Sequence, residues 1–345
     1  SPRGVVPGSS VVQSRAEART AQVSLNDPTH SALDGAKREL GERLSRRPPS
    51  IPSKYFYDDR GSALFDAICD LPEYYLTRTE RALLDERSPE IADITRAREL
   101  VELGAGTARK TGHLIESLMD LGHGLHYTPL DISPYALEQA ESSLGRAYPD
   151  LRITGIQCDY TRSLEELEPD PGCLTVFLGS TIGNFTVEAG AALLRRLRDR
   201  LSPGDWFLLG VDLVKENRIL EAAYNDSRGI TAEFNKNILN VVNRRAEGNF
   251  DLSAFDHLAF FDEEKSQIEM HLVARVASRV RLEALDLDLA FAVGERIQTE
   301  VSRKFTRESA HELLEAAGFE PRYWFTSDDA YFGLALAAVP KAPDP

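Results

Sequence analysis

A short apolar strand that ends in a glycine-rich turn and continues into a helical pattern limits this chain to very few folds. The segment has the sequence VELGAGT and spans residues 101–107. Gly104 and Gly106 let the backbone approach a ligand closely, and the free amides at the start of a helix favour oxygen-rich or anionic groups. The turn therefore predicts that a nucleotide-like ligand binds next to Gly104.

Around this turn, short apolar runs alternate with helical patterns, which is typical of a parallel sheet wound with helices. In the first helical pattern, Leu114, Ile115 and Leu118 form one apolar stripe that suits a helix lying on a sheet. The alternation predicts strands at residues 99–103, 127–130, 153–158, 174–178 and 206–213, and helices at residues 107–121, 134–146 and 187–201.

The alternation lapses between Val214 and Arg303 and then resumes. A doubly wound core interrupted by an insertion explains this pattern better than two consecutive domains. The expected fold is therefore α/β, a Rossmann-like core with an inserted second α+β domain. Further helices are expected at residues 31–45 and 307–317, and further strands at 267–276, 278–284, 294–301 and 332–339. The predicted core is 79–213 plus 304–345, and the predicted substrate-binding domain is 29–78 plus 214–303.

Charge and composition argue against several classes of function. The chain of 345 residues has 40 Lys and Arg against 55 Asp and Glu, and its net charge of −15 opposes binding to nucleic acid or an anionic membrane. Cys69, Cys158 and Cys173 are too widely spaced for a disulfide framework or a zinc knuckle, and no histidines have ligand spacing, so we expect no metal. The longest strongly apolar stretch is far too short to span a membrane. We expect a cytoplasmic monomer with a flexible leader at residues 1–28.

Three kinds of ligand site are compatible with a glycine turn, and the spacing distinguishes them. A dinucleotide fingerprint needs a third glycine three residues after Gly106, where this chain has Arg109. A phosphate loop matches Gly104, Lys110 and Thr111 but lacks the second glycine that lets the backbone wrap the phosphates. A nucleoside-triphosphate-binding module therefore remains a less favoured alternative.

The ends of the next two predicted strands favour a third kind, the S-adenosylmethionine-dependent methyltransferases, whose first motif resembles the E-x-G-x-G-T found here. The second strand ends at Asp131, whose carboxylate can accept both hydroxyl hydrogens of a ribose. The third ends at Asp159 and Tyr160, where this class commonly has a polar residue next to the adenine amine. Each aspartate alone could cap a turn, but three matching strand ends favour S-adenosylmethionine.

Longer strings in the sequence resemble one family, the histidine-specific methyltransferases of the ergothioneine pathway, which trimethylate the α-amine of free L-histidine. The resemblance runs from about residue 30 to residue 339. It is carried by KYFYD (54–58), LPEYY (71–75), FLGSTIGN (177–184) and TEVSRKF (299–305), together with the glycine turn. It implies two domains, with the N-terminal segment and the insertion covering the methyltransferase core.

The resemblance also implies roles for particular residues. Around the cofactor it places Tyr74, Gly104, Lys110, Asp131, Asp159 and Tyr160. Around the amino acid it places Tyr57, Gly179, Thr181, Asn184, Tyr224, Met270, Glu300 and Ser302. Asn184 and Tyr224 would hold the carboxylate of the substrate. Glu300 and Ser302, an i, i+2 pair on one strand, would hold the imidazole ring. Tyr57 would be catalytic, orienting the amine and relaying its proton.

The expected activity is the transfer of three methyl groups from S-adenosylmethionine to L-histidine, giving hercynine. Mono- and dimethylated histidine are then substrates as well. Two alternatives keep the resemblance, namely a methyltransferase for another amino acid or amine and a catalytically silent relative. In a further alternative, Arg303 forms an ion pair with Glu300 and alters recognition of the ring.

Overall fold

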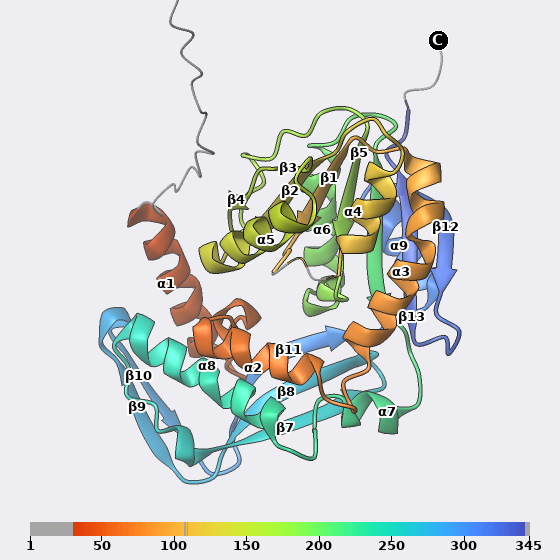
Figure 1. Ribbon diagram of the computed structural model, residues 1–345. Helices are drawn as coiled ribbons and strands as arrows, with labels where there is room; N and C mark the ends of the chain where they lie inside the picture. Colours follow the sequence, from red (N-terminus) through yellow and green to blue (C-terminus); the bar gives the residue numbers. More distant parts are fainter. Residues whose placement is uncertain (1–29, 107, 109, 342–345) are drawn as a thin grey trace, which may run out of the picture.

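The computed structural model describes residues 30–106, 108 and 110–341. One half of the molecule contains an eight-stranded sheet, and the other half contains sheets of three and two strands (Figure 1). No helix in the described part of the chain is long and apolar enough to cross a membrane. The predicted leader at residues 1–28 lies outside the described residues.

The large sheet has the strand order β12-β13-β6-β5-β1-β2-β3, with β4 also pairing with β2. Its strands are parallel except β13, which runs antiparallel to both neighbours. Because β1 lies between β2 and β5, the chain reverses its direction of winding there, and the carboxyl ends of these strands are where such sheets bind ligands. The bounds are β1 (Glu99–Leu103), β2 (His126–Asp131), β3 (Arg152–Ile153), β4 (Ile156–Gln157), β5 (Cys173–Phe177), β6 (Trp206–Asp212), β12 (Glu320–Thr326) and β13 (Phe332–Ala338).

Helices cover both faces of this sheet, which explains why its strands are apolar on both sides. Leu100 and Val101 are adjacent in β1, point to opposite faces and are both completely buried. Helices α3 (Leu76–Thr95), α4 (Gly112–Met119) and α5 (Pro134–Ala147) pack on one face, and α6 (Val187–Arg198) and α9 (Arg307–Ala316) pack on the other.

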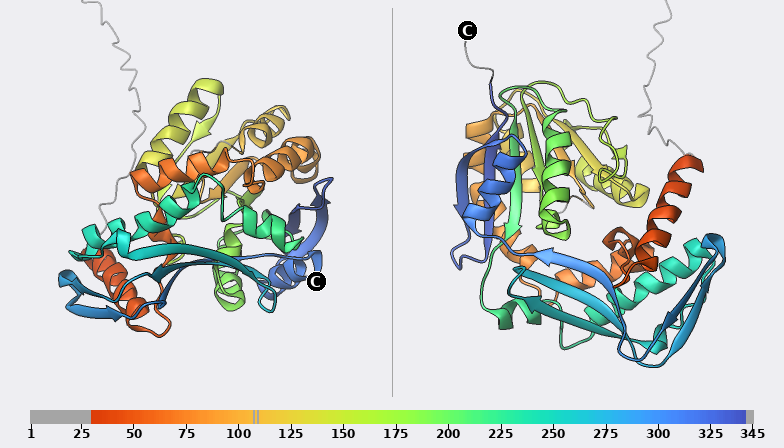
Figure 2. Two further views of the ribbon diagram at one scale, coloured as in Figure 1. Left: turned by 90° about the horizontal axis from the view of Figure 1, so that it is seen from below. Right: turned by 180° about the vertical axis from the view of Figure 1, so that it is seen from behind.

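The other half of the molecule joins segments that are distant in the sequence (Figure 2). A single hydrophobic cluster combines side chains from residues 40–76 with side chains from residues 220–297. The helical elements are α1 (His30–Ser45), η1 (Ser53–Phe56), α2 (Asp59–Cys69), α7 (Asn217–Ala222), α8 (Ile230–Ala246), η3 (Leu252–Ala254) and η4 (Glu283–Leu285). The strands are β7 (Phe255–Asp262), β8 (Gln267–Ala274) and β11 (Arg296–Arg303) in one sheet, and β9 (Ser278–Leu282) and β10 (Leu287–Phe291) in a hairpin.

The predicted α/β fold is confirmed, and two predicted elements are wrong in detail. The helix predicted at 107–121 is shorter and spans Gly112–Met119, with Thr111 as its N-cap. The strand predicted at 153–158 is two short strands, β3 and β4, which pair with β2 at different points. Helix α3 was not expected because Pro89, normally a helix breaker, lies inside it.

Candidate active site

The carboxylate at the end of β2 is hydrogen-bonded to the glycine turn. Gly104 (φ 65°) and Gly106 (φ 52°) are in the left-handed region that favours glycine. The Gly106 N–H donates to Oδ2 of Asp131 at 2.8 Å, and the Ser133 N–H donates to Oδ1 at 2.9 Å. Burial raises the pKa of Asp131 against the opposing effect of these hydrogen bonds. Each carboxylate oxygen keeps a lone pair for another donor, such as a ribose hydroxyl.

A buried carboxylate that no sequence motif predicts connects the glycine turn to the end of β5. Glu80 on α3 is completely buried. Its Oε2 accepts a hydrogen bond from Lys110 Nζ at 2.6 Å, and its Oε1 accepts one from the Gly179 N–H at 2.6 Å. Gly179 has φ 76°, and a Cβ there would lie 3.2 Å from Lys110 Nζ. Glu80 therefore fixes Lys110 beside the end of β5, and glycine is required at 179.

The two residues predicted for the adenine end of the site have different surroundings. The Tyr160 hydroxyl lies 3.2 Å from the position that a Cβ on Gly104 would take, so Tyr160 borders the glycine turn. Asp159 forms an ion pair with Lys54 of η1 at 3.1 Å, and Lys54 also pairs with Glu39 of α1 at 2.8 Å. Asp159 thus connects the large sheet to the N-terminal segment.

The string FLGSTIGN folds as the end of β5, a turn and the short helix η2 (Thr181–Asn184). A Cβ on Gly183 would lie 2.7 Å from the carbonyl oxygen of Arg303, so glycine lets η2 approach the backbone of β11. The Thr181 hydroxyl donates to the carbonyl of Leu178 at 2.9 Å. Within the described residues, the half-buried Asn184 side chain forms no hydrogen bond, which leaves its amide free for a ligand.

One extra residue in β11 decides which way its polar side chains point. The pairing of β11 with β8 shifts between Gln298 and Glu300, so Thr299 is the additional residue of a β-bulge. The Thr299 hydroxyl forms a hydrogen bond to a side chain of α8 at 2.6 Å. Beyond the bulge, Glu300 lies opposite Met270, and Ser302 follows on the same face. Met270 belongs to the hydrophobic cluster, so this face is the inner face of the sheet.

Glu300 is the free carboxylate of this inner face. Burial raises its pKa to about 7, and the Lys304 ammonium acts in the opposite direction. Within the described part of the chain, Glu300 has no hydrogen-bond or ion-pair partner. Arg303 lies opposite Gln267 on the outer face, so the alternative in which Arg303 pairs with Glu300 is wrong. Glu300 is therefore available to accept a hydrogen bond from a ligand.

Two tyrosines of the N-terminal segment complete the site. Tyr57 is 40% exposed, yet burial raises the pKa of its phenol well above the usual value, and the carboxylates of Glu300 and Asp131 add to this. The ring of Tyr74 is buried and contacts the ring of Tyr224 edge-on, with centroids 6.3 Å apart. The Tyr57 hydroxyl thus lies within electrostatic reach of both candidate ligand-binding carboxylates.

A network of buried charges lies behind Ser302. Lys304 Nζ lies 2.9 Å from Ser302 Oγ, 3.1 Å from the Tyr224 hydroxyl and 2.8 Å from Asp212 Oδ2. The Tyr224 hydroxyl donates to Ser302 Oγ at 2.9 Å. Asp212 ends β6 and also pairs with Lys215 at 2.6 Å. Ser302 and Tyr224 are therefore hydrogen-bonded to each other and to a buried ammonium.

Two members of this network, Lys304 and Asp212, were not predicted, although the sequence held a signal for each. Asp212 is the polar residue that ends a buried apolar strand, the same pattern that identified Asp131. Lys304 follows Ser302 by two residues and so continues the face of Glu300 and Ser302. For Glu80, which projects from a helix distant in the sequence, the sequence held no such signal.

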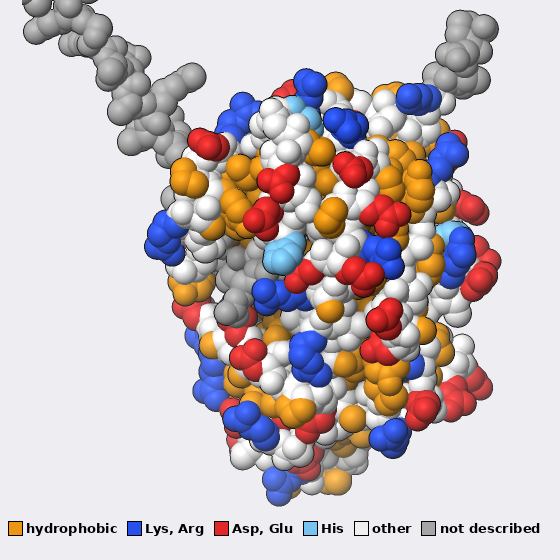
Figure 3. Space-filling model, turned by 45° about the vertical axis from the view of Figure 1, so that its right-hand side comes forward, with side chains coloured by type: hydrophobic (Ala, Val, Ile, Leu, Met, Phe, Trp, Pro, Cys, Tyr) orange, Lys and Arg blue, Asp and Glu red, His pale blue; other side chains and the backbone are white. Residues whose placement is uncertain are grey.

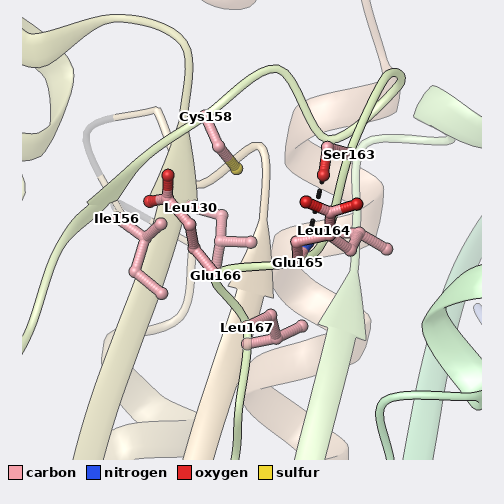
Figure 4. Close-up of a pocket in the computed structure, with 8 residues that line it drawn as sticks. All are labelled: Leu130, Ile156, Cys158, Ser163, Leu164, Glu165, Glu166 and Leu167. Carbon is pink, nitrogen blue, oxygen red and sulfur yellow. Dashed lines mark hydrogen bonds between the residues drawn. The ribbon is translucent and has the colours of Figure 1, made fainter. Parts of the chain in front are cut away.

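A separate small cavity lies beside the end of β2 (Figure 4). It has a volume of about 40 Å³. Such a volume holds a few water molecules at most and cannot contain a nucleoside. It lies between the strand ends and the segment that follows Tyr160, and its lining is Leu130, Ile156, Cys158, Ser163, Leu164, Glu165, Glu166 and Leu167.

The strand order, the glycine turn and the carboxylate at the end of β2 define a Rossmann-like protein of the S-adenosylmethionine-dependent methyltransferase class. The model of the family described as histidine-specific, S-adenosylmethionine-dependent methyltransferases matches residues 36–339. The chain therefore belongs to this family.

The chain is similar to several individual proteins. The chain is 44% identical over 307 residues to the histidine N-alpha-methyltransferase of Mycolicibacterium smegmatis, which covers 89% of this chain and 96% of the relative. It is 29% identical over 282 residues to ergothioneine biosynthesis protein 1 of Schizosaccharomyces pombe, covering 78% of this chain and 36% of the relative. A solved S-adenosylmethionine-dependent methyltransferase from Clostridium acetobutylicum covers 80% of this chain and 98% of its own, with a TM-score of 0.46 and 13% identity.

Proposed function

We propose that the protein transfers methyl groups from S-adenosylmethionine to the α-amine of free L-histidine, in three successive rounds that give hercynine for ergothioneine biosynthesis. Membership of the family and the similarity to a histidine N-alpha-methyltransferase support this proposal. The structural observation that carries it is the Glu300 carboxylate on the inner face of β11, which has no hydrogen-bond or ion-pair partner among the described residues.

The residues around the glycine turn suit S-adenosylmethionine, which supplies an electrophilic methyl group on a sulfonium. A Cβ on Gly106 would meet no described atom within 4 Å, so there is room for a ligand against the turn. Asp131 would accept the ribose hydroxyl hydrogens, and the Lys110 ammonium, which also pairs with Glu80, would face the carboxylate of the cofactor. Asp159, Tyr160 and Tyr74 would complete this side of the site.

The residues on the other side suit histidine. The free amide of Asn184 would donate to the substrate carboxylate without adding a positive charge near the sulfonium. A role for Tyr224 at that carboxylate remains a prediction, since its hydroxyl donates to Ser302 in this structure. Glu300 and Ser302 would bind the two ring nitrogens. Met270, Gly179 and Thr181 would form the walls.

Catalysis would rest mainly on positioning. Holding the nitrogen, methyl carbon and sulfur in line within about 3 to 3.5 Å can lower the barrier by roughly 7 to 11 kcal/mol. The amine must be neutral to attack, and a neighbouring sulfonium favours loss of its proton. The raised pKa of Tyr57 keeps its hydroxyl protonated at neutral pH. Tyr57 would therefore orient the amine, and it would relay the ammonium proton by giving its own hydroxyl hydrogen to water while accepting that proton, so that it would not act as a phenolate base.

We further propose that the enzyme is a cytoplasmic monomer whose partners are small molecules, with cofactor-binding and substrate-binding domains at the predicted boundaries. The surface supports the absence of nucleic-acid and membrane partners. Acidic and basic side chains are interspersed on the face in Figure 3, and the net charge of the chain is −15.

The test is an assay of the purified protein with S-adenosylmethionine and each of the twenty amino acids, followed by mass spectrometry. We expect up to three added methyl groups on histidine and none on the others. Methylation of tryptophan or tyrosine in place of histidine would overturn the substrate. Tight binding of ATP without binding of S-adenosylmethionine would instead support the nucleoside-triphosphate module.

A further inference from the structure

The Lys304 ammonium lies behind Glu300 and Ser302, the proposed binding site of the imidazole ring, and all three of its hydrogens are engaged in hydrogen bonds. Its three hydrogens match its three close oxygen neighbours, at 2.8 Å on Asp212, 2.9 Å on Ser302 and 3.1 Å on Tyr224. The Lys304 side chain has no exposed surface. Asp212 holds the pKa of Lys304 above its usual value despite burial, so Lys304 stays an ammonium.

Asp212 itself is held in place from several directions. Its carboxylate accepts hydrogen bonds from the Tyr75 hydroxyl at 2.9 and 2.8 Å and pairs with Lys215 at 2.6 Å. Its backbone N–H donates to the Ser180 hydroxyl at 2.9 Å. Because the anion that Lys304 faces cannot move freely, Lys304 cannot turn away from Ser302 and Tyr224.

Counting donors and acceptors then limits what Ser302 can offer a ligand. A hydroxyl has one hydrogen and two acceptor positions. Ser302 Oγ accepts one hydrogen bond from Lys304 and one from Tyr224, so both acceptor positions are filled. Its single hydrogen is the only group left to meet a ligand. The hydrogen of Tyr224 is used within the pair.

We propose that Lys304 is a positioning residue that makes Ser302 a hydrogen-bond donor and thereby sets the specificity of the ring site. Glu300 on the same face has no hydrogen to give when ionised. Together they select a ring in which one nitrogen has a lone pair that accepts from Ser302 and the other has an N–H that donates to Glu300. This is the neutral tautomer of imidazole. The proposal rests on histidine being the substrate and adds how its ring is chosen.

Two ring analogues test this directly. Pyrrol-2-yl-L-alanine and pyrrol-3-yl-L-alanine keep an N–H at one ring position and have carbon in place of the other nitrogen. In the unmodified enzyme, we expect kcat/KM for histidine to exceed that of the better analogue by about 100-fold, since the Ser302 hydrogen faces carbon. In Lys304→Met the ratio should fall to about tenfold or less, because Ser302 can then turn its hydrogen toward Tyr224.

A matched control separates this role from a merely structural one. Lys215 also pairs with Asp212 but does not contact Ser302. Lys215→Met should therefore leave the ratio of kcat/KM values unchanged, even if it lowers stability. Thermal unfolding of every variant is measured in parallel. If Lys304→Met does not fold, Lys304→Gln provides the same test, because its amide can still donate to Asp212 while its oxygen gives the Ser302 hydrogen another acceptor.

The outcomes are distinguishable from failure of the proposed function. If the unmodified enzyme does not methylate histidine, the proposed function fails. If it does, but the ratio in folded Lys304→Met or Lys304→Gln equals that of the unmodified enzyme, only the role of Lys304 is overturned.

Discussion

Glu80 and Gly179 are 99 residues apart in the chain, yet Glu80 Oε1 accepts the Gly179 N–H at 2.6 Å. The second oxygen of the same carboxylate accepts Lys110 at 2.6 Å. One side chain from α3 therefore sets the distance between the loop after β1 and the end of β5. These are the two strand ends between which a ligand of this sheet binds.

Glu80→Gln should weaken binding of S-adenosylmethionine by about tenfold and lower stability by about 1–3 kcal/mol. The amide cannot accept from both Lys110 and Gly179, and it leaves the ammonium without its counterion. Calorimetric titration and thermal unfolding measure the two effects. Glu86→Gln, at an exposed position of the same helix, is the control and should change neither. Unchanged affinity in folded Glu80→Gln would show that Glu80 does not organise the cofactor side.

Tyr57→Phe should lower kcat for the first methylation by about 10- to 100-fold and leave the affinity for S-adenosylmethionine unchanged. The edge-on contacts of the ring with Phe65 and Phe234, at 5.8 and 6.0 Å, do not need the hydroxyl, so the fold should be retained. Tyr55→Phe is the matched control, because that hydroxyl bonds only to the carbonyl of Ala36. Unchanged rates at all three methylation stages would rule out the proton relay.

The pH profile of kcat/KM for histidine should have a rising limb at about pH 7 that belongs to Glu300. Below this pH the carboxyl is protonated and is a poorer acceptor for a ring N–H; above it the carboxylate accepts. Glu300→Gln should lose this limb. At pH 8 its kcat/KM should be about tenfold lower, because a neutral amide then accepts the ring N–H in place of a carboxylate. Histidine titrates identically in both assays, so the difference between the profiles isolates Glu300. The control Glu264→Gln, at an exposed position, should keep the rising limb. If Glu300→Gln also keeps this limb, the limb does not belong to Glu300.

Stability should depend on pH through Glu102, which is buried under the glycine turn. Burial raises its pKa from 4.5 to about 7, although Thr111 and Tyr127 donate to it at 2.6 and 2.5 Å. Between these two pH values the folded state keeps a proton that the unfolded chain has released. The free energy of unfolding therefore decreases as the pH rises from about 4.5 through 7.

When the pH is raised from 5 to 8, the free energy of unfolding of Glu102→Gln should therefore increase by about 2–3 kcal/mol relative to that of the unmodified protein. Denaturant unfolding at both pH values measures the difference. Exposed Glu116→Gln should show no such gain. Equal pH dependence of the unmodified protein and Glu102→Gln would mean that Glu102 is already ionised in the folded state.

The sheet and its ligand-binding edge could be predicted because their signals are local. Strand β1 was predicted with its observed bounds, and Asp131 was identified from its place at the end of an apolar run. The roles assigned to the site residues remain predictions. The structure does bring together the chain segments that carry them.

What the sequence did not show depends on contacts between distant segments. Glu80 looks like any surface glutamate of an amphipathic helix until the fold brings it to Gly179. The ion pair between Lys54 and Asp159 joins η1 to the end of the third strand region and has no local pattern. Lys304 and Asp212 each have a local signal, but their pairing depends on the fold, because lysine and aspartate are normally exposed.

The bulge at Thr299 has a consequence for how a family like this can change its substrate. Pairing Thr299 regularly with Met270 would shift the register by one residue and turn positions 300 and 302 to the outer face, while Val301 would point inward. A substitution at position 300 alone does not change which side chains of the strand face inward. New ring chemistries are therefore open to point mutation, whereas a one-residue slip in the pairing of this strand would move both polar side chains away from the ring site at once.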